Sequence, residues 1–313
     1  MKHQKNANAL IIILLIALLA AGVVILGLPL KNRQTGGGEN TPPDNPPTTS
    51  IEPVNPEPTP TPTSKPTPKP TPTHISHSTV ESNQPQHHPA RIAIIIDDFG
   101  DGTEIEKAIL NLPYPINISV LPQRTFSTET AREVLGMHKT LLLHLPMEPM
   151  IPRDSSSLTK IKPGMSQEEV AQIIESDLAQ VPGAQGINNH EGSKTTADPD
   201  VMEKVMKVIQ GKNLFFIDSR TTSVSVAAKT AERNGIPYAQ RNIFLDNENN
   251  PDYVRGQLKE LLHDAEVEGQ AIGIGHPRSA TLQVLREDLG NLLNQKQVKI
   301  VPITELLQNP NEN

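Results

Sequence analysis

Six apolar runs of the chain end directly before polar residues that could do chemistry. The polar residues at these six ends are Asp97 with Asp98, His144, His190, Asp218 with Arg220, Asp246, and His276. Two imidazoles and a carboxylate that converge on one point can bind zinc and leave a coordination position open. A third imidazole nearby can act as a general acid. These residue types therefore indicate a zinc site, provided that the fold brings the six ends together.

The elements that must position these residues alternate between apolar runs and helical patterns. We predict strands at Ile92–Ile96, Ile116–Val120, Thr140–Leu145, Gln185–Asn188, Leu214–Ile217, Tyr238–Phe244, Ala271–Ile274 and Val298–Val301. Several of these runs are apolar at consecutive positions, which is typical of strands that are buried on both faces. The alternation predicts an α/β fold, a distorted (β/α) barrel of seven or eight mostly parallel strands. In such a barrel the carboxyl ends of all strands meet on one face, so the polar residues are expected to meet there.

Local signals support the helices between these strands. Ser166 and Glu169 form a capping box, and Asp198 precedes a proline at the first position of the next helix. Three further helices are predicted at about Ser223–Asn234, from near Pro251 to Gly269, and across Leu282–Leu292.

Each candidate residue also has an ordinary structural interpretation. Asp97 and Asp98 could cap a loop, and His144 could be a hydrogen-bonded core histidine. His190 lies in a turn-like segment, Asp218 and Arg220 could form a structural ion pair, and His276 could end a strand before a proline. Together these interpretations require several such residues to reach one end of the barrel by chance, so we favour one shared site.

Composition excludes several classes of function. The chain has no cysteine, which excludes disulfides, cysteine-bound zinc, iron–sulfur clusters and thiol nucleophiles. From Arg91 onward 30 acidic residues outnumber 22 basic ones, which argues against a nucleic-acid binder. The sequence contains no phosphate-binding loop, no His-Glu-x-x-His motif and no Gly-x-Ser-x-Gly elbow.

The amino-terminal part has a different character. Residues 1–33 contain an uncharged apolar run, Ala9–Leu28, which as a helix would span about 30 Å, the thickness of a bilayer core. No convincing cleavage site follows it, so a single-pass membrane anchor is favoured over a removed signal peptide. Residues 34–90 are rich in proline and threonine and predict a disordered stalk. Residues 91–313 remain as one globular domain.

At the motifs around its candidate residues the chain resembles the divergent polysaccharide deacetylase family, a branch of the carbohydrate esterases with a NodB-like barrel. The matching segments are IAIIIDDFG, LLLHLPMEP, GINNHEGS, FFIDSRTTSVSVA and IGIGHP. They occur in the expected order over nearly all of the chain after Arg91. The resemblance implies a metal-dependent enzyme, with zinc as the first candidate, that hydrolyses N-acetyl groups on a polysaccharide.

The resemblance also implies a role for each residue. Asp97 would be the base, Asp98 and His144 would bind the metal, and His276 would be the general acid. The family's usual second metal histidine is replaced by Glu148, and we expect His190 to supply the missing ligand. In addition, Asp218 is expected to orient the general acid, and Arg220 to tether the base.

An anchor and a stalk fit a substrate outside the cytoplasm, such as a cell-wall glycan, with the protein held in the cell membrane. Two alternatives remain open. The domain could be a catalytically silent barrel that binds wall glycan or a partner protein, or it could be a metal hydrolase of another amide or ester. Nothing in the sequence indicates an oligomeric state.

Overall fold

A computed structural model describes residues 89–152 and 158–310 of the chain. Its sheet has the strands β1 (Arg91–Phe99), β2 (Asn117–Val120), β3 (Leu141–Met147), β4 (Gly186–Glu191), β5 (Phe215–Asp218), β6 (Tyr238–Gln240), β7 (Ile243–Phe244), β8 (Gln270–Gly275) and β9 (Lys299–Ile300). The strand order is β6-β5-β4-β3-β2-β1-β8-β7, β9 pairs with the start of β1, and every pair of neighbouring strands is parallel. Each predicted strand is confirmed, but Tyr238–Phe244 is divided into β6 and β7.

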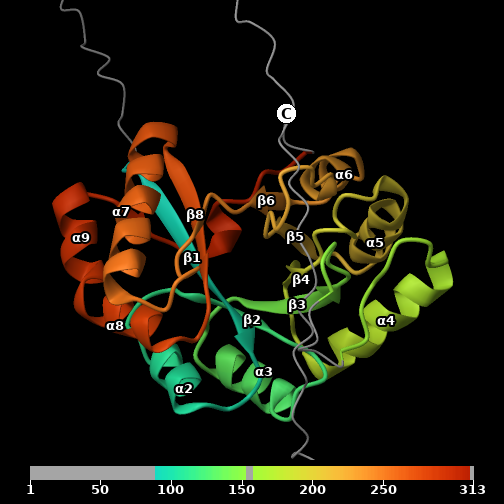
Figure 1. Ribbon diagram of the computed structural model, residues 1–313, viewed down its shortest axis with the longest axis horizontal. Coiled ribbons are helices and arrows are strands. Elements are labelled where there is room, and N and C mark those ends of the chain that lie inside the picture. The colour runs from blue at the N-terminus through green and yellow to red at the C-terminus, as the bar shows by residue number, and fades with distance from the viewer. Residues whose placement is uncertain (1–88, 153–157, 311–313) are drawn as a thin grey trace, which may run out of the picture. The chain divides into compact units, whose positions relative to one another are not determined.

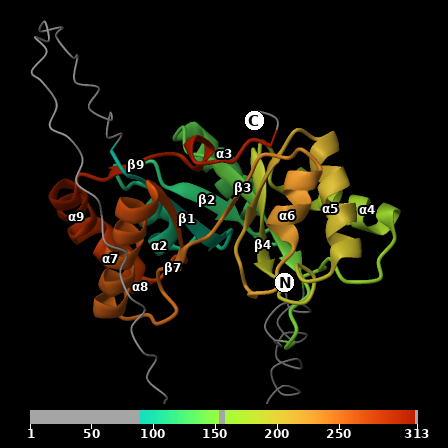
Figure 2. The same ribbon diagram turned by 90° about the horizontal axis from the view of Figure 1, so that it is seen from above.

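Helices connect the strands and cover the outside of the sheet (Figures 1 and 2). They are α2 (Glu104–Leu110), α3 (Ser127–Gly136), α4 (Gln167–Gln180), α5 (Pro199–Gly211), α6 (Ala227–Arg233), α7 (Pro251–Glu268), α8 (Ser279–Glu287) and α9 (Leu289–Lys296), with a short 3₁₀ turn at Ile303–Glu305. The Ser166–Glu169 capping box and the Asp198 cap are both present. Helix α6 starts later than predicted, because Ser225 is held in the preceding turn by its bond to Asp218.

The sheet curls into an incomplete barrel, and the segment from Tyr238 to Phe244 shows why. Its first half pairs with β5 and its second half pairs with β8, so the two edges of the sheet lie only two residues apart in the chain. β6 and β7 run in the same direction and cannot pair with each other, because parallel neighbours need a connection of about a dozen residues or more. A cavity of about 780 Å³ opens at this seam, lined by Gln240, Gln270 and Ile272 among others. The predicted parallel α/β barrel is therefore confirmed in outline, but its ring is incomplete at the seam.

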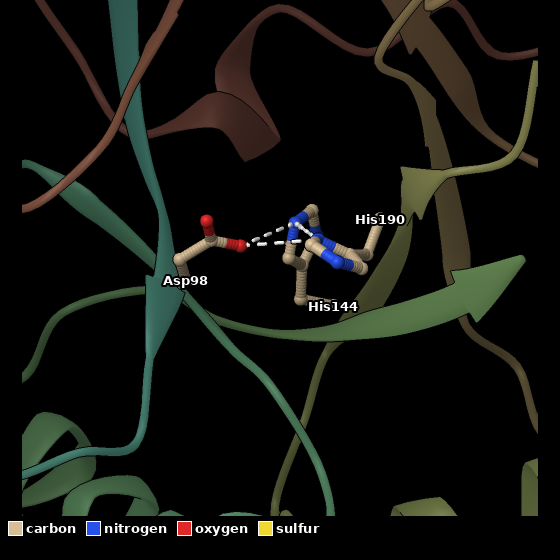
Figure 3. A group of neighbouring side chains, drawn as sticks. All are labelled: Asp98, His144 and His190. Atoms are coloured by element: carbon tan, nitrogen blue, oxygen red, sulfur yellow. Dashed lines mark hydrogen bonds and ion pairs between the residues drawn. The ribbon is translucent and has the colours of Figure 1, made fainter. Parts of the chain in front are cut away.

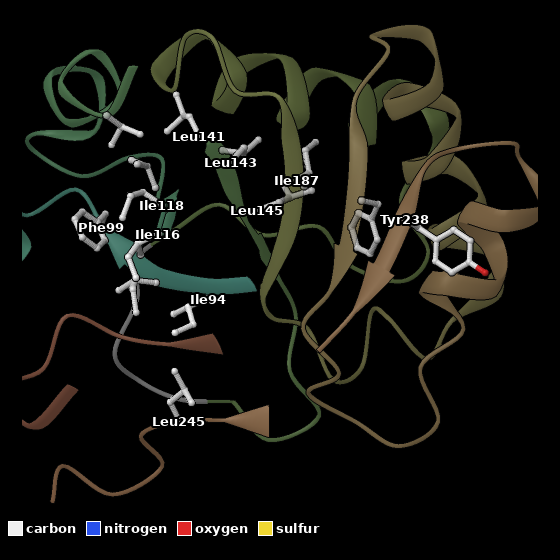
Figure 4. Close-up of a cluster of buried hydrophobic side chains, with 14 of the residues drawn as sticks. Ile94, Phe99, Ile116, Ile118, Leu141, Leu143, Leu145, Ile187, Tyr238 and Leu245 are labelled. Carbon is white, nitrogen blue, oxygen red and sulfur yellow. The ribbon is translucent and has the colours of Figure 1, made fainter. Parts of the chain in front are cut away.

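Alternate residues of the strands serve two different cores. The outward residues Ile94, Ile118 and Leu143 belong to a large cluster that also contains helix residues (Figure 4). The inward residues Ala93, Ile95 and Leu142 belong to a smaller cluster inside the barrel. Both faces of the strands are buried, as their continuous apolar runs predict.

The carboxyl-terminal segment closes the end of the barrel at which the strands begin. Ile303 and Leu306 are buried in the inner cluster. The backbone N–H of Ile303 donates to the side-chain oxygen of Asn117 at 2.9 Å, and the backbones of Gln308 and Tyr238 exchange two hydrogen bonds. The opposite end, where the strands finish, carries the polar residues.

The predicted anchor and almost all of the predicted stalk lie outside the described residues. Within residues 89–152 and 158–310, none of the helices combines the length and apolar character needed to cross a membrane.

Candidate metal centre

A bend at the end of β1 brings two neighbouring carboxylates to the same side. On a regular strand Asp97 and Asp98 would point to opposite faces. Here Asp98 has a φ of 58°, and the register between β1 and β2 shifts between Ile96 and Phe99. A non-glycine residue in this conformation costs about 1–2 kcal/mol. The bulge therefore turns Asp98 back toward the interior, where Asp97 already points.

Asp98, His144 and His190 form a compact group on β1, β3 and β4 (Figure 3). The Oδ1 atom of Asp98 lies 3.3 Å from Nε2 of His144 and 3.1 Å from Nδ1 of His190. The two histidine nitrogens lie 3.2 Å apart. The three residues that the sequence singles out as metal ligands are thus brought together by the fold.

The donor set fits zinc. Tetrahedral zinc with bonds of about 2.0–2.1 Å places its ligand atoms about 3.3 Å apart, close to the three observed separations. Oδ1 of Asp98 is also buried and accepts no hydrogen bond of good geometry from the described residues. Its polar neighbours are the two imidazole nitrogens, and a cation between these three atoms would give the buried oxygen a stronger partner.

Asp98 and the two histidines stabilise each other's charged forms. Burial alone would raise the pKa of Asp98, but the adjacent imidazoles of His144 and His190 hold it well below its usual value. Burial alone would lower the pKa of His144, but the carboxylates of Asp97 and Asp98 raise it. Asp98 is therefore ionised, as a metal ligand must be.

Asp97 lies beside this group and is almost fully buried. Its Oδ1 accepts a hydrogen bond of 2.8 Å from the side-chain amide of Asn188, and its Oδ2 lies 3.6 Å from Nε2 of His144. Burial raises the pKa of Asp97, against the opposing effect of His144 and His276. A carboxylate of raised pKa next to a metal position suits a general base.

His276 approaches the group from the end of β8. Its Nε2 lies 3.9 Å from Oδ2 of Asp98. Its Nδ1 donates to Oδ1 of Asp246 at 2.8 Å, and its backbone N–H donates to the other oxygen of Asp246 at 2.6 Å. Thr281 donates to Asp246 as well, at 2.7 Å. Burial favours a lower pKa of His276, but the bond to Asp246 and the other carboxylates outweigh it and raise the pKa.

The expectation that Asp218 orients His276 is therefore not met, because Asp246 occupies that position. Asp246 follows β7, which is the direct neighbour of β8, whereas Asp218 ends β5, which does not neighbour β8. Asp218 instead accepts hydrogen bonds from Ser225 and from the backbone of Arg220, within its own turn.

The expected tether between Arg220 and Asp97 is not observed either. Arg220 is exposed, has a φ of 47° and lines the seam cavity. Among the ion pairs of the described residues none joins Arg220 to Asp97, and the polar contact that restrains Asp97 comes from Asn188. The sequence places Asn188 in a strand but carries no signal for this contact.

Glu148 does not join the metal group. Its carboxylate pairs with Lys194 at 2.8 Å, and it lies outside the three-residue cluster. His190, and not Glu148, is the third member of the group.

A cleft of about 730 Å³ gives access to these side chains. Asp97, Asp98, His144, His190 and His276 all line it. Its rim includes the exposed side chains of Met150 and Ile151. An open cleft of this size can admit part of a polymer.

Phe244 is the aromatic side chain of the cleft. Its ring stacks near His276, with ring centroids 6.3 Å apart and 18° between the planes. The guanidinium of Arg241 lies 3.7 Å from the Phe244 ring centroid. Phe244 therefore supports the His276 ring from one side.

A family profile and two relatives of known sequence match the part of the chain that contains the metal group. A family profile described as divergent polysaccharide deacetylase matches residues 94–307. The uncharacterised protein YibQ of Escherichia coli K12 is 36% identical over 220 residues, covering 70% of this chain and 68% of its own length. An uncharacterised protein of Haemophilus influenzae is 36% identical over 225 residues, covering 70% of this chain and 78% of its own length.

A similar fold is also present among solved structures. The crystal structure of an uncharacterised protein from Agrobacterium tumefaciens C58 superimposes with a TM-score of 0.66. The two share 18% sequence identity, and the match covers 71% of this chain and 90% of the other. At this identity the likeness concerns the fold alone.

Proposed function

The chain belongs to the divergent polysaccharide deacetylase family, and from this membership and the geometry of the centre we propose that it is a metal-dependent hydrolase of N-acetyl groups on a polysaccharide. The observation that carries the proposal is the convergence of Asp98, His144 and His190 within 3.3 Å of one another. Asp97 and His276 flank this group, so an acid and a base stand next to one metal position.

A divalent metal held by the three ligands, with zinc as the first candidate, would lower the pKa of a water and polarise the acetyl carbonyl. Asp97 is placed to accept the proton of the attacking water. Its raised pKa favours this role, and its bond to Asn188 keeps one oxygen fixed while the other faces the centre.

His276 is placed to protonate the nitrogen that leaves when the amide bond breaks. Its Nδ1–H is committed to Asp246, so Nε2 is the nitrogen that faces the cleft. The raised pKa of His276 keeps the ring protonated closer to neutral pH, as a general acid requires.

The site of action in this proposal is outside the cytoplasm. The support is the predicted anchor at residues 1–33 and the predicted stalk at residues 34–90, which would hold the domain away from a bacterial cell membrane. A cell-wall glycan is the N-acetylated polysaccharide that such a position would reach.

The test is release of acetate by the purified, zinc-loaded protein from N-acetylated oligosaccharides and from peptidoglycan. Asp97→Asn and His276→Ala should each lower the rate by at least about 100-fold, the range of general acid–base catalysis. His263→Ala is the matched control, because His263 is exposed on α7 away from the cleft, and it should keep the full rate.

Other outcomes of this test would point to the alternatives. Hydrolysis of a different amide or ester, with the same dependence on Asp97 and His276, would make the protein another metal hydrolase. Zinc binding and glycan binding without turnover of any substrate would make it a binding protein and would contradict the proposal.

A further inference from the structure

We propose that Asn188 is the positioning residue of this centre, and that the two ends of its carboxamide hold His144 and Asp97 in their working orientations. This inference rests on the function proposed above. Asn188 lies on β4, fully buried, and its Cα pairs in register with that of His144 on β3. Its side chain points into the barrel between the candidate ligand and the candidate base.

All hydrogen-bonding capacity of the Asn188 side chain is used. Its Oδ1 accepts from Nδ1 of His144 at 3.0 Å and from the hydroxyl of Ser119. Its Nδ2 donates to Oδ1 of Asp97 at 2.8 Å and to the hydroxyl of Ser219 at 3.2 Å. An amide has two acceptor sites and two donor hydrogens, and each has a partner here.

The partners define which way the amide faces. If its oxygen and nitrogen were exchanged, the oxygen would lie against the carboxylate of Asp97, and two acceptors would meet without a hydrogen between them. The observed orientation avoids this contact and places the oxygen opposite Nδ1 of His144. Nδ1 must then carry a ring proton, which leaves Nε2 as the nitrogen that faces Asp98 and His190.

The two functions of the amide can therefore be separated by substitution. Asn188→Leu has a similar volume but removes both the acceptor for His144 and the donor for Asp97. Asn188→Asp keeps an acceptor for His144 but replaces the donor to Asp97 and Ser219 with a carboxylate oxygen, so it places a second negative charge against Asp97. Asn189→Leu is the matched control, since Asn189 is also buried and its side chain bonds to the backbones of Glu191 and Ser219 and, among the described residues, neither to His144 nor to Asp97.

The experiment compares the full-length protein with these three variants in two measurements, zinc affinity by competition with a chelator and steady-state deacetylation. Asn188→Leu should bind zinc about 10- to 100-fold more weakly, the usual effect of removing a group that orients a ligand. Asn188→Asp should bind zinc at least as tightly as the parent, because its carboxylate also accepts from Nδ1 of His144, but it should lose kcat by about 10-fold or more. Asn189→Leu should lose thermal stability to a degree similar to Asn188→Leu and keep its zinc affinity.

Zinc binding by Asn188→Leu at the parent's affinity would overturn the inference. Full kcat in Asn188→Asp would also overturn it, and this isosteric variant decides the matter if Asn188→Leu does not fold. A parent that binds zinc but releases no acetate would refute the proposed function, while the zinc affinities would still test the role of Asn188.

If the parent protein binds no zinc, the tautomer of His144 in the metal-free protein still tests the inference. The ¹⁵N shifts of the His144 ring, measured at alkaline pH in the metal-free protein, report which nitrogen carries the proton. The parent should show the Nδ1–H form, and Asn188→Leu should show a mixture or the Nε2–H form. An unchanged tautomer would contradict the inference even if the parent binds no zinc.

Discussion

The two ends of the barrel are made by the same strands but have opposite chemistry. Along the inward face of β1, Ala93 and Ile95 are followed by Asp97, and on β3 Leu142 is followed by His144. The end where the strands begin is apolar and is sealed by the carboxyl-terminal segment. The end where they finish is polar and opens into the cleft. Inward positions two residues apart on one strand thus serve stability at one end and chemistry at the other.

The two ends of the barrel also contribute differently to the stability of the fold. The sealed end buries apolar side chains, which stabilises the fold. The open end buries the carboxylate of Asp97, holds Asp98 at a positive φ and leaves Oδ1 of Asp98 without a hydrogen bond. Burial of charge and a positive φ are each unfavourable, and the bond from Asn188 and the two imidazoles act against them. The open end is expected to depend on a metal, whereas the sealed end is not.

The largest expected effect is that of Asp98→Ala. Loss of a ligand should abolish zinc retention and lower deacetylation by at least about 10³-fold, since metal assistance contributes several kcal/mol. Without zinc the variant should be less stable than the parent at neutral pH, because the Asp98 carboxylate pairs with His144 and His190 and alanine tolerates a φ of 58° less well than aspartate. Metal analysis and thermal unfolding, with and without zinc, measure both effects. A variant that keeps one zinc per chain would contradict the assignment of Asp98 as a metal ligand.

At the sealed end, Ile303→Ala should have the converse effect. Truncation of this fully buried side chain should cost about 2–4 kcal/mol of unfolding free energy. Zinc affinity and kcat of the folded protein should stay unchanged, because the side chain lies at the other end of the barrel. Denaturant unfolding and zinc titration separate these quantities, and a parallel loss of zinc affinity would show that the two ends are coupled.

At the open end, Asp246→Asn separates the orientation of His276 from the binding of the metal. Asp246 orients His276 but is not among the ligands, so the variant should keep zinc while kcat falls by about 100-fold. A variant that loses zinc together with kcat would make Asp246 part of the metal site. Asp218→Asn is the control and should retain most of the rate, because the Asp218 carboxylate accepts from Ser225 and from the backbone of Arg220 and not from His276.

The smallest expected effect concerns Asp177, a buried carboxylate of α4 outside both ends of the barrel. Its Oδ1 accepts from Gln123 at 3.0 Å, its Oδ2 has no partner among the described residues, and burial raises its pKa to about 6. This pKa exceeds the unfolded value of about 3.9, so stability should fall as the pH rises from about 4 to 6 and stay lower above that range.

Asp177→Asn should remove that decline and be more stable than the parent by about 1–2 kcal/mol at pH 8, with unchanged zinc affinity. Urea unfolding at pH 4.5 and pH 8 checks this prediction. A variant that is less stable than the parent at pH 8 would show that the ionised carboxylate has a stabilising partner.

Much of the fold could be predicted from the sequence, because its signals are local. Continuous apolar runs identify strands buried on both faces, and caps such as Asp198 identify where helices begin. The segment Tyr238–Phe244 is one exception, since one run cannot show that its halves pair with opposite edges of the sheet. The single helix predicted across Leu282–Leu292 is another, because the structure divides it at Asp288 into α8 and α9. The convergence of Asp98, His144 and His190 could be predicted because parallel strands end on one face.

The partners of these residues could not be predicted, because they depend on strand order and register. His276 is bonded to Asp246 rather than Asp218 because β7 lies beside β8. Asn188 reaches His144 because the register of β3 and β4 pairs the two residues, and it reaches Asp97 on β1, a strand that does not neighbour β4. The positive φ of Arg220, which belongs to its local turn, likewise has no signature in its residue type.

The central claim is that Asp98, His144 and His190 hold one metal ion. Anomalous diffraction at the zinc absorption edge, from crystals of the protein grown with zinc, tests it most directly. The account predicts a single strong peak per chain within bonding distance of Asp98 Oδ1, His144 Nε2 and His190 Nδ1. Zinc-loaded crystals with no peak between these three atoms, or with the only peak elsewhere, would contradict it.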